Sequence, residues 1–154
     1  MKKSRTTADE LAALFLALGD RTRLRLLNLM LDGEVCVCFF VEVLGELQPK
    51  ISRHLASLRS AGLVSARRDA KWAHYAITPP DSAPARAAFD AIMATMKEDR
   101  QMQRDRATLA RVCCSTRAPE LLKRAPRPAI ASRDATPDAG FRNDRKRPRA
   151  AKSV

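Results

Sequence analysis

The sequence predicts a mainly α-helical domain that carries one small β-hairpin, and three observations support this fold class. Apolar residues between positions 7 and 62 recur every three or four residues, as they do on the buried face of a helix. Across residues 63–77 they alternate instead, which is typical of strands. Hydrophobic residues make up 45% of the chain, enough for a packed core. The resulting order of helices, tight helix–turn–helix, hairpin and final helix is that of a winged helix-turn-helix.

The first helix is expected over residues 7–19, because Thr7 and Glu10 form a capping-box pair at its start. Its apolar stripe consists of Leu11, Leu14, Phe15 and Leu18. Asp20 is a suitable N-cap for a second helix, and Gly33 is a suitable stop. The apolar face of this second helix consists of Leu24, Leu27 and Leu31. Both helices therefore have one face to bury against the rest of the domain.

A third, short helix is expected from about residue 38 to residue 44, with Gly45 ending it. Pro49 suits the first position of a fourth helix, and Gly62 lies at its C′ position. The apolar faces of the two helices consist of Val37, Val41 and Leu44, and of Ile51, Leu55 and Leu58. Because only a short turn separates them, these two helices form the helix-turn-helix.

A two-stranded hairpin, the wing, is expected over residues 63–77, with its tip at residues 68–71. We expect His74 on the surface of this wing. After two prolines, Ser82 can cap one long helix that continues to about Val112. The apolar seam of that helix consists of Phe89, Ile92, Met93 and Met96. One helix cannot bury such a seam alone, so we expect a homodimer through the first and last helices.

The formal charge of +12 is large for 154 residues and indicates a polyanionic partner, most simply nucleic acid. Much of this charge lies in residues 116–154, which hold eleven Lys or Arg, four acidic residues and five of the nine prolines. We therefore divide the chain into a DNA-binding and dimerisation domain, residues 1–115, and a basic, Pro-rich tail, residues 116–154. The tail is expected to be disordered, and either to add sequence-independent DNA affinity or to have no measurable effect.

No apolar run approaches the ~20 residues that a transmembrane helix needs. Residues 11–18 resemble the short apolar core of a signal peptide, but Asp9 and Glu10 interrupt the basic flank and the apolar spacing is helical. We therefore expect a cytoplasmic protein with no membrane partner. In that compartment the four cysteines stay reduced and serve as ligands or sensors.

Basic residues gather where a winged helix-turn-helix meets DNA. The second helix of the motif enters the major groove, and Gln, Arg or Lys at its N-terminal end can bond to base edges. A wing tip meets backbone phosphates or the minor groove. Between residues 48 and 75, six residues are basic and one is acidic. The expected DNA-binding residues are Gln48, Lys50, Ser52, Arg53, His54 and Arg59 in the helix, and Arg67, Arg68 and Lys71 in the wing.

The stretch EVCVCFFVEVLGELQPKISRHLASLRSAGLV, residues 34–64, followed by KWAHYAI, resembles the ArsR/SmtB family of metal-responsive repressors, and most of all its arsenic-sensing branch. The similarity extends from residue 8 to about residue 100. It implies a dimeric winged helix that needs no cofactor to bind a palindromic operator and block transcription of an arsenic-resistance operon. It also implies that arsenite or antimonite, As(III) or Sb(III), binds the thiols of Cys36 and Cys38 as inducer and releases the DNA.

The chain departs from the arsenic-sensing pattern at three places. A third Cys of that branch falls at Val41, which puts the affinity and the choice of metal in question. Leu47 occupies the place of the Ser that usually precedes the recognition helix. The wing turn has Asp69 and Ala70 where Gly is common. The last two departures leave the implied function intact.

Trivalent arsenic is soft and binds two or three thiolates. Two residues two positions apart on an ideal helix point about 200° apart, whereas an extended backbone places both on one side. Chelation by Cys36 and Cys38 therefore requires a non-helical start to the third helix, and ligation would distort that helix and move the recognition helix. A third ligand could come from Cys113 or Cys114, because in a dimer this end of the last helix could approach the partner's third helix.

Two other functions fit parts of the sequence. A thiol redox or persulfide sensor could use either cysteine pair, and oxidant alone would then release the DNA. A non-specific DNA-coating protein, driven by the basic tail, would bind every sequence equally and with a steep salt dependence. An enzyme is not expected, because a dithiol reductase needs C-x-x-C spacing, and neither a nucleophile–base pair nor a phosphate-cradling Gly loop is present. Residues 82–112 contain no His and residues 1–35 no Cys, which disfavours the other metal sites of the family.

Overall fold

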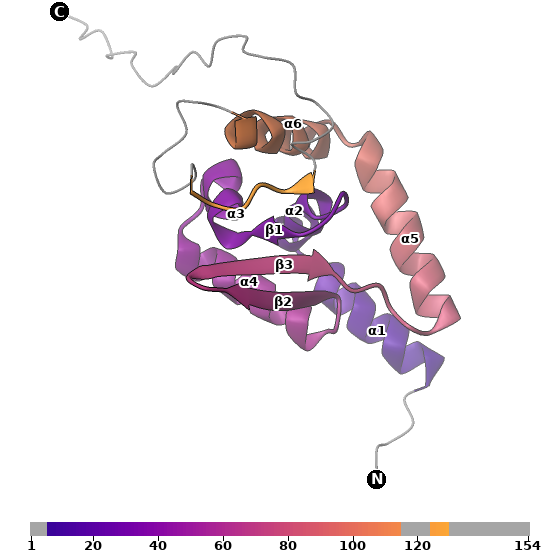
Figure 1. Cartoon of the computed structure of the whole chain (residues 1–154). Coiled ribbons are helices and arrows are strands. Elements are labelled where there is room, and N and C mark those ends of the chain that lie inside the picture. Colours follow the sequence, from indigo (N-terminus) through magenta and orange to yellow (C-terminus); the bar gives the residue numbers. More distant parts are fainter. Residues whose placement is uncertain (1–5, 115–123, 130–154) are drawn as a thin grey trace, which may run out of the picture.

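The computed structural model describes residues 6–114 and 124–129 (Figure 1). Along the chain the elements are α1 (Thr7–Leu18), α2 (Arg21–Leu29), β1 (Val35–Cys36), α3 (Val37–Leu44), α4 (Gln48–Ser60), β2 (Val64–Asp69), β3 (Trp72–Ile77), α5 (Ala83–Glu98) and α6 (Arg100–Cys114). The three strands form an antiparallel sheet in the order β1-β3-β2. Helices α3 and α4 form the helix-turn-helix and β2 and β3 the wing, so the predicted winged helix-turn-helix is confirmed.

Local sequence signals set most helix ends. Asp20 caps α2, because its Oδ1 accepts a hydrogen bond from the Arg23 N–H at 2.9 Å. Gly45 ends α3 with φ at +66°, a left-handed conformation that glycine adopts without strain. The capping box of α1 lies one residue earlier than predicted. Its partners are Thr6 and Asp9, with the Asp9 N–H donating to Thr6 Oγ1 at 3.2 Å.

The prediction of one long final helix is wrong, because the chain breaks at Asp99. The backbone of Asp99 is extended, with ψ at 129°, and its Oδ1 accepts hydrogen bonds from the N–H groups of Gln101 and Met102 at 2.8 and 3.0 Å. A carboxylate in this position ends α5 and satisfies the first donors of α6. Ser82 is the N-cap residue of α5 as expected, although its hydroxyl makes no capping bond.

Helix α6 is fixed to α2 by polar side chains at an otherwise apolar contact. Asp105 is only 3% exposed and accepts two hydrogen bonds from Arg25, at 2.6 and 2.8 Å. Asn28, also buried, donates to the Met102 carbonyl at 3.0 Å. These bonds hold α6 over α2 and α3, whereas α5 runs beside α1 (Figure 1). The last two helices therefore cover different faces of the domain.

A short piece of the tail belongs to the folded part. Ala125 is buried in the hydrophobic core, and the Cβ of Ala129 lies 3.3 Å from where a Cβ on Gly33 would be. This piece, residues 124–129, is drawn in orange in Figure 1. The composition of the tail gave no reason to expect it. The rest of the predicted tail lies outside the described residues. None of the helices in the described part combines the length and hydrophobicity of a membrane-spanning segment.

Candidate thiol site and nucleic-acid interface

The two thiols of the C-x-C pair lie next to each other. Cys36 is the last residue of β1 and the N-cap of α3, with φ at −71° and ψ at 141°, while Cys38 is the second residue of the helix. This extended backbone brings both side chains to one side, and the Cys38 thiol donates to Cys36 Sγ over 3.1 Å. The helix start is thus non-helical at Cys36 before any ligand binds, which is the geometry that the sequence analysis required for chelation.

The surroundings of Cys36 favour a thiolate at neutral pH. The pKa of Cys36 is lowered from 9.0 to about 7, mainly by the hydrogen bond from Cys38. Burial raises this pKa, whereas the backbone N–H groups of Cys38, Ala73 and Val37 lower it further. The same contact, burial and the charge on Cys36 raise the pKa of Cys38. Above about pH 7 the pair therefore shares one proton, with the negative charge on Cys36. A thiolate is the form of cysteine that binds metals.

Cys113, a candidate third ligand, is buried on α6. Helix α6 lies against α3 of its own chain. Within the described part of the chain, no three His, Cys, Asp or Glu side chains gather closely enough to hold one metal ion. The side chain of Cys114 lies outside that part. The described side chains of one protomer thus offer a two-sulfur site.

His74 is not a surface residue, which corrects the sequence-based expectation. It is 3% exposed, because the short strand β1 pairs with β3 and covers it, with Cys36 directly opposite His74. On its other side His74 lies opposite Arg67 of β2. The sequence did not reveal this pairing, because a two-residue strand has no recognisable pattern. The sheet therefore connects the thiol strand to the wing through His74.

Glu34 is a further residue of this region that sequence analysis did not single out. Its carboxylate accepts hydrogen bonds from Arg67 at 2.6 and 3.2 Å and lies 3.4 Å from His74 Nδ1. The contact with Arg67 lowers the pKa of Glu34 and raises that of Arg67. The one available signal was its position two residues before Cys36, which in an extended strand places both on the same face. Arg67 is thus paired within the protein rather than open to a ligand.

The start of helix α4 presents a polar and basic surface. The side chains of Ile51, Leu55 and Leu58 are completely buried against the domain. The rest of the helix surface is exposed at the predicted residues Gln48, Lys50, Ser52, Arg53 and Arg59. Lys50 also forms an exposed ion pair with Glu46, at 2.7 Å. Pro49 lies in the first turn, where its missing N–H costs no helical hydrogen bond.

His54 differs from the other predicted residues of α4. It is half-buried, and its Nδ1 lies 3.4 Å from Asp20 Oδ1, the group that caps α2. Its proximity helps to lower the pKa of Asp20. His54 therefore lies on the side of α4 that faces α2, and it joins the two helices.

The wing exposes its predicted basic residues. Arg67, Arg68 and Lys71 all lie on the surface, and the Lys71 ammonium sits 5.0 Å from the centre of the Trp72 ring. At the turn, Ala70 has φ at +50°, a left-handed conformation that explains why Gly is common at such positions. The wing and the start of α4 together form the candidate nucleic-acid interface.

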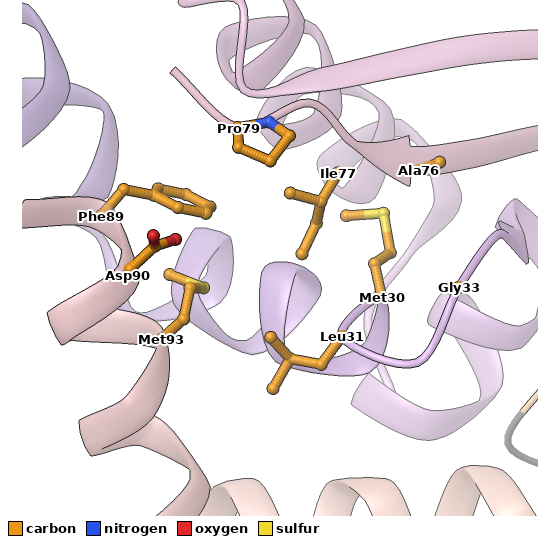
Figure 2. Close-up of a pocket in the computed structure, with 9 residues that line it drawn as sticks. All are labelled: Met30, Leu31, Gly33, Ala76, Ile77, Pro79, Phe89, Asp90 and Met93. Atoms are coloured by element: carbon orange, nitrogen blue, oxygen red, sulfur yellow. The ribbon is translucent and has the colours of Figure 1, made fainter. Parts of the chain in front are cut away.

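An open hollow of about 360 Å³ lies away from both candidate sites, between α2, β3 and α5 (Figure 2). Figure 2 shows Phe89 and Met93 of α5 facing Ile77 across it. Its lining consists of Met30, Leu31, Gly33, Ala76, Ile77, Pro79, Phe89, Asp90 and Met93. These residues include neither of the paired thiols and none of the predicted DNA-binding residues.

Comparison with known proteins agrees with this architecture. Residues 20–66 match the model of the bacterial regulatory proteins of the arsR family. The chain is 44% identical over 103 residues to the "Arsenical resistance operon repressor" of Escherichia coli (strain K12), covering 66% of this chain and 86% of that protein. It is 47% identical over 66 residues to "Arsenic resistance transcriptional regulator ArsR2" of Pseudomonas putida, covering 42% of this chain and 57% of that protein.

Among solved structures, HlyU from Vibrio cholerae N16961 matches with a TM-score of 0.51 at 28% identity, covering 62% of this chain and 97% of that chain. Its similarity supports the fold, while the extent of the E. coli match supports the family. The chain therefore belongs to the arsR family of bacterial regulatory proteins and is a DNA-binding transcriptional regulator of winged helix-turn-helix fold.

Proposed function

We propose that the protein is the repressor of an arsenic-resistance operon and that arsenite or antimonite releases it from its operator by binding Cys36 and Cys38. The observation that carries this proposal is the pair of sulfur atoms 3.1 Å apart at the start of α3, one of them with its pKa lowered to about 7. The names of the E. coli and P. putida relatives support arsenic as the inducer.

Binding of arsenite to this pair is a ligand exchange without oxidation or reduction. Each new As–S bond would replace an As–OH bond, and each hydroxyl would leave as water. The Cys38 thiol would supply the proton for one exchange, and solvent would supply it for the exchange at the Cys36 thiolate. Two sulfurs bound to one tetrahedral atom at about 2.3 Å, as in zinc–thiolate sites, lie about 3.8 Å apart, and the narrower pyramid of trivalent arsenic brings them closer than that. The sulfurs of Cys36 and Cys38 would therefore separate by less than about 1 Å.

Two connections would transmit this movement to the DNA. Cys38 lies within α3, the first helix of the helix-turn-helix, which packs against α4. Cys36 lies in β1, which pairs with β3 of the wing. A shift at the thiols therefore acts on both DNA-binding elements at once. The required coupling is of ordinary allosteric size, about 1–3 kcal/mol per site.

In the repressing state, Gln48, Lys50, Ser52 and Arg53 read base edges, and Arg59, Arg68 and Lys71 contact the backbone. Arg67 stays paired with Glu34. His54 positions α4 against α2. Two exposed apolar residues of α1, Phe15 and Leu16, support a homodimer in which α1 and α5, rather than α6, meet the second copy.

A thiol redox sensor is the second candidate, favoured by the same short sulfur–sulfur separation. A disulfide needs sulfurs about 2.05 Å apart and a two-electron oxidant such as a peroxide. Both candidates are tested by measuring operator binding with fluorescence anisotropy, in one titration with arsenite under full reduction and in another with peroxide after the reductant has been removed. Release by arsenite alone supports the proposed function, whereas release by peroxide but not by arsenite contradicts it.

A further inference from the structure

Leu47 is an exposed apolar residue at the start of the recognition helix. Its side chain is 78% exposed, although it is a large hydrophobic group. Its backbone has the N-cap conformation, and its carbonyl accepts hydrogen bonds from the N–H groups of Lys50 and Ile51 at 3.0 and 3.1 Å. The side chain itself makes no capping bond. The side chain of Leu47 thus contributes neither to the helix cap nor to the core of its own chain.

The position of Leu47 decides which partner its side chain can meet. It precedes Gln48 directly and lies at the exposed end of α4, where Lys50 and Arg53 are also exposed. In a helix-turn-helix this end of the second helix approaches the base edges in the major groove. Those edges present hydrogen-bonding groups and one kind of apolar group, the C5-methyl of thymine. A leucine can contact that methyl group and can satisfy none of the polar ones.

We propose that Leu47 contacts a thymine methyl group in each half-site of the operator and so contributes to sequence specificity. This inference rests on the proposed function, because it requires the protein to bind a specific duplex through α4. Burying one methyl-sized group is worth roughly a fourfold change in affinity. Two half-sites bound by a dimer should therefore give roughly a 15-fold effect.

The experiment removes the methyl groups without changing any hydrogen-bonding group. A duplex is first selected from a random-sequence pool with the wild-type protein, then prepared with deoxyuridine in place of every thymidine. Dissociation constants for both duplexes are measured with wild type, Leu47→Ser and Leu47→Met. Methyl contacts made by other residues and changes in DNA shape affect all three proteins equally, so they cancel when the losses are compared.

The loss of affinity on the uracil duplex should be roughly 15-fold larger for the wild type than for Leu47→Ser, and nearly as much larger for Leu47→Met. Equal losses in wild type and Leu47→Ser would overturn the inference. The inference would also be overturned if Leu47→Ser changed the dimerisation of the protein and left its loss of affinity on the uracil duplex equal to that of the wild type. Because the side chain is exposed, both variants should keep the wild-type circular dichroism, and Leu47→Asn provides a second polar variant. Failure of sequence-specific DNA binding, on which the inference rests, would look different, since the wild type would then select no duplex from the pool. Failure of arsenite induction alone would leave these affinities unchanged.

Discussion

Replacing Asp105 by Asn should destabilise the protein far more than so small a change in the side chain suggests. The carboxylate is 3% exposed, and it accepts hydrogen bonds from Arg25 at 2.6 and 2.8 Å and from Gln101 at 2.8 Å. Removing one partner of a buried ion pair costs about 3–5 kcal/mol, because the other charge stays buried. The Arg25 side chain is 20% exposed, so water screens part of this loss. We therefore expect the free energy of unfolding to fall by about 2–3 kcal/mol.

Thermal and urea unfolding of the full chain, followed by circular dichroism, measures this loss, which should lower Tm by roughly 8–12 °C. The matched control is Asp90→Asn, which breaks the exposed pair with Arg86 on α5. Exposed pairs one helical turn apart contribute less than about 0.5 kcal/mol. If Asp105→Asn were no more destabilising than Asp90→Asn, then α6 would not be anchored to α2 in the way described.

Three further predictions follow from the region around the thiols. The absorbance of the Cys36 thiolate should appear with a midpoint near pH 7 and vanish in Cys36→Ser, and a midpoint near 9 would contradict the assigned contacts. Because folding lowers this pKa, the contribution of the thiolate to stability is complete above about pH 9 and is lost as the pH falls through about 7. Glu34→Gln should free Arg67 for a phosphate, so operator binding should tighten and its salt dependence should steepen by up to about one phosphate contact. The free energy of unfolding should change by less than about 1 kcal/mol, and weaker operator binding would show that Glu34 orders the wing instead. Gly33→Ala should lower the free energy of unfolding by about 1–2 kcal/mol, because the φ of Gly33 is +139° and the new Cβ would lie 3.3 Å from the Cβ of Ala129. Urea unfolding that is unchanged from wild type would exclude that contact.

The features that could be predicted from the sequence are local ones. The cap at Asp20 and the stop at Gly45 depend on residues within a few positions of each other, and both signals have a direct backbone cause. The difference between helical and extended backbone also indicated that Cys36 and Cys38 can lie side by side only if the start of α3 is not helical, and in the structure it is not. These short-range constraints were sufficient for the winged helix-turn-helix.

The features that escaped prediction depend on distant residues or on competing signals. The apolar spacing of the seam favoured an unbroken helix across Asp99. The chain breaks there because the Asp99 carboxylate accepts hydrogen bonds from the first N–H groups of α6. The burial of His74 and the pairing of Glu34 with Arg67 follow from the pairing of β1 with β3, which joins segments almost forty residues apart. The packing of Ala125 in the core likewise requires a contact that no local pattern reveals.

The central claim is that occupation of the thiol pair at the start of α3 releases the protein from its operator. Its most direct test is an arsenite titration of the operator complex, under full reduction, with wild type, Cys36→Ser and Cys38→Ser. The account predicts that the wild type dissociates at low arsenite concentration, while both variants bind the operator normally and stay bound. A wild-type complex that survives saturating arsenite, or a Cys36→Ser variant that dissociates like the wild type, would contradict it.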